Sequence, residues 1–178
     1  MTDSTTGGYI VPTGGVAYDQ ELRDIFQAFI RAVVAMDGTL VRPRWQQVPL
    51  PTPDINTDWC AFGVKVTEPN DSPYFEQQDD SAVSIRHESI QVLISFYGPS
   101  SESNINLLKD GLAIPQNIAQ LSQFQIKFVS VDQIIAAPDF LNQQWVQRHD
   151  MTATFRRKTQ RTVPIRTFEN FQINLKNS

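Results

Sequence analysis

The sequence predicts an α+β domain, in which one long and one or two short helices pack on a mixed, mostly antiparallel sheet. An early segment has the three- and four-residue apolar spacing of an amphipathic helix. Several later segments alternate polar and apolar residues, as strands do. Few helical segments separate these strands, so hairpin-like neighbours outnumber crossovers. That order favours a sheet with its helices on one face.

The chain is long enough for one domain with irregular ends, because 178 residues can bury a substantial core. Residues 1–18 carry two Gly-Gly pairs and are expected to form a flexible arm. The arm has one apolar spot, which consists of Tyr9, Ile10 and Val11. It either frays or becomes ordered on a neighbouring subunit. Residues 19–165 are expected to form the domain, and residues 166–178 a C-terminal tail.

The clearest element is the helix predicted over residues 19–38. Asp19 is a residue type that caps helix N-termini, and Gly38 is one that ends helices. The apolar side chains between them form one broad stripe, which predicts that the helix packs on the core. The stripe consists of Leu22, Ile25, Phe26, Phe29, Ile30, Val33 and Val34.

Three extended segments are predicted next. Residues 39–48 contain Pro43, which cannot donate to a strand ladder, so this segment belongs at a sheet edge. Residues 59–67 alternate strictly and place Cys60 on an apolar face. Residues 83–98 read as a long strand whose apolar residues change face between Ile85 and Ile90. That change of phase predicts a bulge near residues 86–89.

The second half of the chain predicts two short helices and two strands. The helices are expected at residues 102–112 and from Pro115 onwards, and the first strand at residues 125–131. Residues 144–162 alternate strictly and predict a long final strand. Its odd face is apolar (Trp145, Met151, Ala153, Phe155), whereas its even face is polar (Arg148, Asp150, Thr152, Thr154, Arg156, Lys158).

The final strand becomes basic after Phe155, where the odd face continues with Arg157, Thr159 and Arg161. We therefore expect the strand to project beyond its own core. Residues 1–141 hold 8 Lys and Arg against 17 Asp and Glu, whereas residues 142–178 hold 7 against 2. Such an uneven distribution of charge along the chain is evidence about its binding partners rather than about its fold.

Three interpretations of this basic strand remain open. It is a solvated strand end that resists aggregation, a contact with the acidic surface of a neighbouring subunit, or a contact with nucleic acid. A sequence pI near 5.1 argues weakly against nucleic acid as the main partner. The candidate interface residues are Arg148, Arg156, Arg157, Lys158, Arg161, Tyr9, Ile10 and Val11.

No pattern for catalysis, cofactor binding or metal binding is present in the sequence. The eight glycines form no phosphate-binding motif, and His87, His149 and Cys60 lack the spacing of zinc ligands. Cys60 reads as a small buried thiol, and a single cysteine suits a reducing cytosol. No apolar stretch approaches the length of a membrane span. We therefore expect no enzyme, no cofactor, no metal and no membrane partner.

Five stretches in matching order resemble the neck or tail-terminator family of tailed bacteriophages, over about residues 19–165. They are VRPRWQ, DWCAFGV, RHES…VLISFYGP, LKDGLAIPQN and WVQRHDMT. None of these stretches contains a known catalytic residue of the family. The resemblance therefore implies that they serve folding and assembly rather than catalysis.

The resemblance implies a structural virion protein that assembles in the host cytoplasm. Members of the family form a ring, expected to be hexameric, at the head-proximal end of the tail. The ring ends growth of the tail tube and joins the tail to the neck connector. The implied partners are copies of the chain, tube subunits, the connector and, in contractile tails, sheath subunits. Genomic DNA would pass through the lumen without specific binding. The alternatives are another head–tail joining protein, such as a head-completion protein, and a nucleic-acid-binding protein that uses the final strand.

Overall fold

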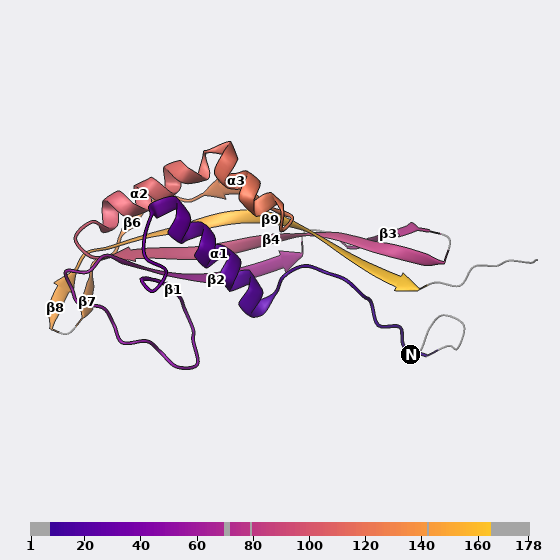
Figure 1. Ribbon diagram of the computed structural model, residues 1–178, viewed down its shortest axis with the longest axis horizontal. Coiled ribbons are helices and arrows are strands. Elements are labelled where there is room, and N and C mark those ends of the chain that lie inside the picture. The colour runs from indigo at the N-terminus through magenta and orange to yellow at the C-terminus, as the bar shows by residue number, and fades with distance from the viewer. Residues whose placement is uncertain (1–7, 70–71, 79, 142, 165–178) are drawn as a thin grey trace, which may run out of the picture.

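Helices cover one face of a mixed sheet in the computed structural model, which describes residues 8–69, 72–78, 80–141 and 143–164 (Figure 1). The helices in this part of the chain are α1 (Asp19–Val34), α2 (Ser101–Leu112) and α3 (Pro115–Ser122). The strands of the large sheet are β1 (Val41–Pro43), β2 (Trp59–Pro69), β3 (Tyr74–Gln77), β4 (Ser81–Tyr97), β5 (Ile126–Val131), β6 (Ile135–Ala136) and β9 (Arg148–Pro164). Strands β7 (Asp139–Leu141) and β8 (Gln144–Val146) form a separate hairpin. The predicted α+β fold is confirmed.

Two long strands, β4 and β9, form the centre of the sheet. They pair antiparallel along their whole length, from Ser81 opposite Pro164 to Tyr97 opposite Arg148. The sheet order is β1-β2-β4-β9-β5, with β3 paired to β4 and β6 paired to β9. Strand β1 runs parallel to β2, whereas the other pairings in the described part of the sheet are antiparallel. Strands β2 and β3 pair with β4, and strands β5 and β6 pair with β9, so this central pair carries most of the sheet.

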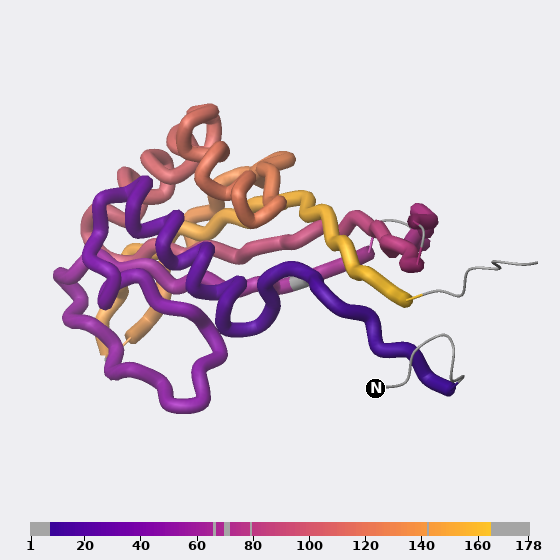
Figure 2. The backbone as a smooth tube through the Cα atoms, turned by 45° about the vertical axis from the view of Figure 1, so that its right-hand side comes forward, coloured from indigo at the N-terminus to yellow at the C-terminus, as the bar shows by residue number. Residues whose placement is uncertain are grey.

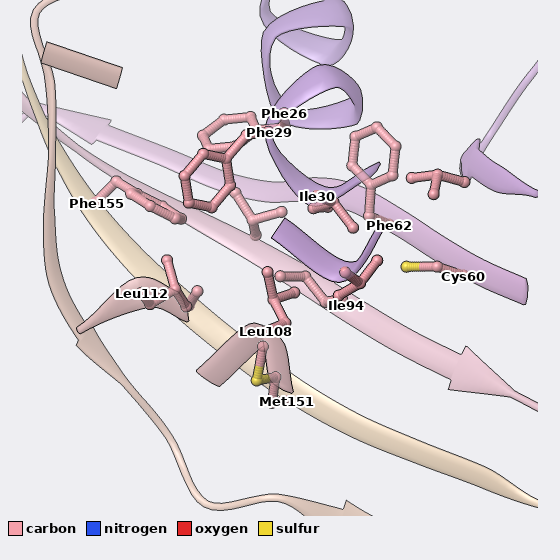
Figure 3. Packing of buried hydrophobic residues seen from close by; sticks show 14 of the residues in the cluster. Phe26, Phe29, Ile30, Cys60, Phe62, Ile94, Leu108, Leu112, Met151 and Phe155 are labelled. Carbon is pink, nitrogen blue, oxygen red and sulfur yellow. The ribbon is translucent and has the colours of Figure 1, made fainter. Parts of the chain in front are cut away.

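The apolar stripe of α1 forms the middle of the core, as the sequence predicts (Figure 3). Phe26 packs on Phe155 of β9, with 5.0 Å between the ring centroids. Ile90, Val92, Ile94 and Phe96 of β4 lie in the same buried cluster. Burying a side chain of this size stabilises a fold by roughly 1.5–3 kcal/mol, so the helix–sheet contact is a main source of stability.

The predicted ends of the first helix need two corrections. Asp19 is the first residue of α1 rather than its cap, and the preceding Tyr18 makes no side-chain capping hydrogen bond. The helix also ends at Val34, four residues before Gly38. Ala35 takes the left-handed conformation there, with φ of 52°, and its position closes the last turn. Sequence rules favour glycine at such a position, so they placed the end too late.

The predicted bulge near residues 86–89 is wrong. Strand β4 keeps a continuous register against β9 through this region. The register shifts occur instead in β2, between Val64 and Val66, and in β5, between Phe128 and Ser130. The apolar residues of β4 change face because its helix-facing side continues with a buried polar residue, Glu88. The pattern of apolar residues does not reveal that a polar residue in the strand is buried.

The far ends of β4 and β9 extend beyond the helices together with β3 (Figure 1). This confirms the expectation that the final strand projects past its own core. Residues 13–18 run beside the projecting end of β9 rather than back over the helices (Figures 1 and 2). We call this region the projecting end; it consists of residues 74–88 of the β3–β4 hairpin that the structure describes and residues 157–164 of β9.

Helices α1 and α2 approach closely at Gly111, and this contact gives a first prediction. A Cβ at Gly111 would overlap Cγ1 of Val33, although alanine is intrinsically better in a helix than glycine by about 1 kcal/mol. We expect Gly111→Ala to lower the free energy of unfolding in the wild-type background. In a Val33→Ala background, where the obstructing methyl groups are removed, the same change is expected to be neutral or stabilising.

Urea unfolding of the four proteins in this double-mutant cycle measures the coupling. Val33→Ala alone serves as the control for the loss of the valine methyl groups. An equal cost of Gly111→Ala in both backgrounds would show that the two side chains do not compete for the same space.

Candidate functional site

The basic residues of β9 divide between the two faces of the sheet. Met151, Ala153 and Phe155 point toward the helices and are buried. Arg157 and Thr159 continue the same face and are also buried, with Arg157 only 1% exposed. Arg156 on the opposite face is exposed. The alternation predicted from the sequence is therefore confirmed from Arg148 onwards, but its inner face stays buried past Phe155. The prediction is wrong for Trp145, which lies on β8 of the separate hairpin and is 71% exposed.

Arg157 is held by an ion pair inside the chain. Its Nη2 lies 2.7 Å from Oε2 of Glu88 on β4, and its Nε donates to the same oxygen at 3.2 Å. Its Nη1 donates to the carbonyl oxygen of Ala17 in the arm. The guanidinium carbon also lies 4.5 Å from the ring centroid of Tyr18. Arg157 thus connects β9, β4 and the N-terminal arm, and it is not available at the surface.

The second carboxylate oxygen of Glu88 is also satisfied. Nη2 of Arg86 lies 2.6 Å from Oε1, and the hydroxyl of Tyr18 donates to the same atom at 3.2 Å. Burial acts to raise the pKa of Glu88, but hydrogen bonds and charge from Arg157, then Arg86 and Tyr18, outweigh it. The net pKa is lower than the ordinary value of 4.5, so Glu88 is a carboxylate at neutral pH.

The described part of the N-terminal arm is anchored on β9. Thr13 and Thr162 exchange two backbone hydrogen bonds of 2.8 and 2.9 Å. Strand β4 occupies one edge of β9 along its whole length, so Thr13 lies at the other edge, in line with β5. Nη1 of Arg161 donates to the carbonyl oxygen of Gly14 at 3.1 Å. Arg161, a predicted interface residue, therefore contacts its own arm.

The outward face of the sheet carries a basic cluster, which we define as Lys127, Arg156, Lys158 and His87. Arg156 is the cross-strand partner of Lys127 on β5, and Lys158 is the partner of His87 on β4. Cross-strand partners point to the same side of a sheet, and Arg156 and Lys158 are two residues apart. Among the residues that the structure describes, Lys127, Arg156 and Lys158 make no ion pair.

Arg148 lies at the opposite end of β9 and does not join this cluster. Eight residues of strand separate it from Arg156, a distance of about 26 Å. It donates two hydrogen bonds to Asp150, at 2.8 and 2.7 Å, and contacts Asp139 at 3.3 Å. The bonds to Asp150 raise the pKa of Arg148, although burial opposes them. The basic cluster therefore contains two of the five predicted basic residues, whereas Arg157 and Arg161 both lie against the ring of Tyr18.

The apolar spot of the arm is exposed. Tyr9 is 94% exposed and Val11 76%, while Ile10 is 39% exposed. These residues precede the anchor at Thr13 and follow the projecting end away from the helices (Figure 2). Tyr9 and Val11 therefore bury little of their surface in this chain, whereas Ile10 is partly covered.

An open apolar groove lies between α1 and α3, and no pattern in the sequence predicts it. Its volume is about 500 Å³. The floor and walls are mainly apolar, and polar side chains form the rim. The lining residues used below are Ile25, Ala28, Phe29, Leu121 and Phe124, with Gln120 at the rim. Phe124 is 40% exposed, so an aromatic ring is open to solvent there. We call this the α1–α3 groove.

The described residues contain no group of three or more side chains that could hold a metal ion. Cys60 is fully buried, and burial raises the pKa of its thiol. The Nδ1 of His149 lies 3.0 Å from Oγ of Ser101, which gives this histidine a structural partner. Of the helices described, none has the length and apolar character needed to cross a membrane.

A family model described as phage neck terminator protein matches residues 20–178 of the chain. The match covers far more than half of the sequence. The chain belongs to this family of phage neck terminator proteins. A search of curated proteins gives no match. The resemblance stated from the five motifs is thereby confirmed, and the match runs further toward the C-terminus than they did. The protein is a structural component of the phage neck, and the family gives no indication of catalysis.

The Arg157–Glu88 pair gives a second prediction. Removing one member of a buried ion pair typically costs about 3–5 kcal/mol, because the other charge is left without its partner. We expect Arg157→Met to lower the free energy of unfolding by about 3 kcal/mol, since Arg86 still contacts Glu88. The double variant Arg157→Met, Glu88→Met is expected to be more stable than the sum of the single effects predicts.

The matched control is Arg156→Met, which changes the neighbouring, exposed arginine and is expected to alter stability by less than about 0.5 kcal/mol. Urea unfolding monitored by tryptophan fluorescence measures all five proteins: the wild type, Arg157→Met, Glu88→Met, the double variant and the control. Equal effects of Arg156→Met and Arg157→Met would contradict the structural role of the pair.

The lowered pKa of Glu88 gives a third prediction, on pH. The folded chain binds this proton less tightly than the unfolded chain does. Its contribution to stability is therefore complete above the ordinary pKa of 4.5 and is lost as pH falls through the lowered value. We expect the stability difference between wild type and Glu88→Gln to be constant from neutral pH to about pH 5 and to shrink below it. Urea unfolding across this range tests the sign, and a difference that grows on acidification would contradict it.

Proposed function

We propose that this neck terminator protein forms a ring, most simply a hexamer, at the head-proximal end of the phage tail. The ring ends growth of the tail tube and joins the tail to the neck connector. In a contractile tail it also contacts the last sheath subunits. The observation that carries this proposal is the family match over residues 20–178. Genomic DNA passes through the lumen of the ring and is not bound specifically.

A ring requires two unlike surfaces on each subunit, because a cyclic contact is heterologous. The basic cluster supplies one of them, since Arg156 and Lys127 are exposed and Lys158 is half-buried without an acidic partner in the described chain. The chain as a whole carries a net charge of −4, so its remaining surface has an acidic excess. We propose that the basic cluster contacts acidic surface of the adjacent copy, where opposite charges favour one relative orientation.

The projecting end supports an assembled state. Strand β3 lies at the edge of the sheet, and its Tyr74 and Phe75 are 57% and 62% exposed. Exposed aromatic side chains on an edge strand are costly in a solitary molecule and typical of surfaces that other chains cover. We assign this end to contacts with other proteins of the tail or neck.

Nucleic-acid binding is a second candidate function, and the basic cluster favours it. Thr152 and Thr154 lie on the same outward face of β9 and could donate to phosphate oxygens beside Arg156 and Lys158. An electrophoretic shift of duplex DNA by the native protein at physiological salt, abolished by neutralising Arg156 and Lys158, would support this function. If the native protein does not shift the DNA, nucleic-acid binding is contradicted.

The proposed ring gives a fourth prediction. We expect Arg156→Glu with Lys158→Glu to prevent ring formation, because the basic cluster would then repel an acidic neighbour. Light scattering coupled to size exclusion measures the oligomer, and electron microscopy shows whether the protein caps purified tail tubes. The control variant, Lys65→Glu with Lys109→Glu, makes the same change of net charge at exposed residues outside the cluster.

The control is expected to form rings and to cap tubes like the wild type. Normal assembly of both variants would show that the basic cluster is not part of the interface between subunits. A native protein that stays monomeric, and never associates with tubes, would contradict the proposed function itself.

A further inference from the structure

Two apolar features of the described chain have no partner within it. One is the segment Tyr9–Val11, which is solvent-exposed and contains no charged side chain. The other is the α1–α3 groove, whose volume of about 500 Å³ is of the size that accommodates a few side chains. Both features are apolar, so each would bury its surface by contact with the other.

The two features do not meet in the described chain. Thr13 pairs antiparallel with Thr162, beyond the end of the β5–β9 ladder, so the residues that precede Thr13 run outward along β9 and away from the helices. The lining of the groove includes Phe124, two residues before β5 begins, so the groove lies on the helix side of this anchor. Tyr9–Val11 of the same chain therefore run away from the groove, which is open to a segment of another molecule.

We propose that Tyr9–Val11 of one copy occupy the α1–α3 groove of the adjacent copy in the ring. This inference rests on the proposed function, because it requires a ring of identical subunits. The contact is heterologous, as ring closure demands: each subunit offers its arm to one neighbour and its groove to the other. The arm supplies the directional apolar contact that the basic cluster, a purely electrostatic surface, does not supply.

The chemistry of the two surfaces fits this assignment. The groove presents Ile25, Phe29 and Phe124 to apolar side chains. Its one charged lining residue, Asp24, accepts a hydrogen bond from Gln20 at 2.6 Å. The segment Tyr9–Val11 carries no charge, so docking brings no charged side chain of the arm into the groove. The exposed carboxamide of Gln120 at the rim can bond to the backbone of the arm. A largely apolar centre with a polar rim is the usual anatomy of a protein interface.

The anchor at Thr13 reduces the conformational cost of this contact. The bridge to Thr162 and the bond from Arg161 to Gly14 fix the base of the arm before any neighbour arrives. Docking therefore has to position only the few residues between Tyr9 and the anchor, so less entropy is lost than with a free terminus. Pro12, next to the anchor, further restricts the backbone between the bridge and Val11.

Disulfide trapping between two separately prepared proteins tests the contact. One carries Val11→Cys and the other Ala28→Cys, which places a thiol at the edge of the groove. Cys60 is fully buried and serves as an unreactive background in all variants. The matched control replaces Ala28→Cys with Asn106→Cys, an exposed position on α2 outside the groove.

We expect the Val11→Cys and Ala28→Cys mixture to yield disulfide-linked dimers at least about tenfold above the control, because docking raises the local thiol concentration toward the millimolar range. Equal yields with both partners would overturn the inference. So would an intrachain disulfide in a Val11→Cys, Ala28→Cys double variant at high dilution, since the groove would then be filled by its own arm.

The tail provides a competing occupant, and a synthetic peptide of residues 165–178 with an added N-terminal cysteine probes it. Preferential cross-linking of this peptide to Ala28→Cys would overturn the inference by assigning the groove to the tail. A variant that lacks residues 1–12 gives the second readout, because it retains Thr13 and the whole region that the family model matches. We expect it to fold but to form rings at least about tenfold more weakly.

The two proposals fail in different ways. If the native protein forms rings and caps tubes, but neither trapping nor the deletion has an effect, the arm contact is wrong and the proposed function stands. If the native protein forms no ring and binds no tube, the proposed function fails, whatever the arm does.

Discussion

The ion pair between Arg157 and Glu88 is the constraint on which the organisation of the projecting end depends. The two residues are 69 positions apart in the sequence and lie on adjacent strands at the point where the helices stop covering the sheet. Their partners, Ala17 and Tyr18, begin the chain's path into α1. Because a buried charge requires full pairing, the ion pair fixes the strand pair and the arm together. The outward face of the same strands is then left to carry the basic cluster.

The sequence predicts the elements well where local periodicity is the cause. The stripe of α1 is buried because an amphipathic helix with Phe26 and Ile30 on its apolar side packs that side against the core. The register of the sheet is different, since no local pattern tells which residue of β4 lies opposite Arg157. Local alternation therefore gives no reason to expect Glu88 to be buried, and the change of phase around it predicts a bulge. The burial of Glu88 depends on its pairing with Arg157, which lies 69 residues later in the sequence.

The candidate site was accessible to sequence reasoning only in part. Arg156 and Lys158 lie on a polar strand face, and alternation alone identifies them. Their neighbours Lys127 and His87 come from two other strands, and only the pairing of those strands reveals the cluster. The α1–α3 groove is formed by helices about 80 residues apart in sequence, so each looks like an ordinary core helix on its own. Interface features of this kind are properties of packing rather than of composition.

The bridge between Thr13 and Thr162 has a consequence for how the protein is made. The two residues are 149 positions apart, so at a synthesis rate of 5–20 residues per second the arm waits roughly 7–30 s for its anchor to be translated. During that interval the end of β9, on which the arm is anchored, has not yet been synthesised. The arm therefore reaches its anchored form only after the end of β9 has been synthesised, so the anchoring of the arm is a late step in the folding of the chain.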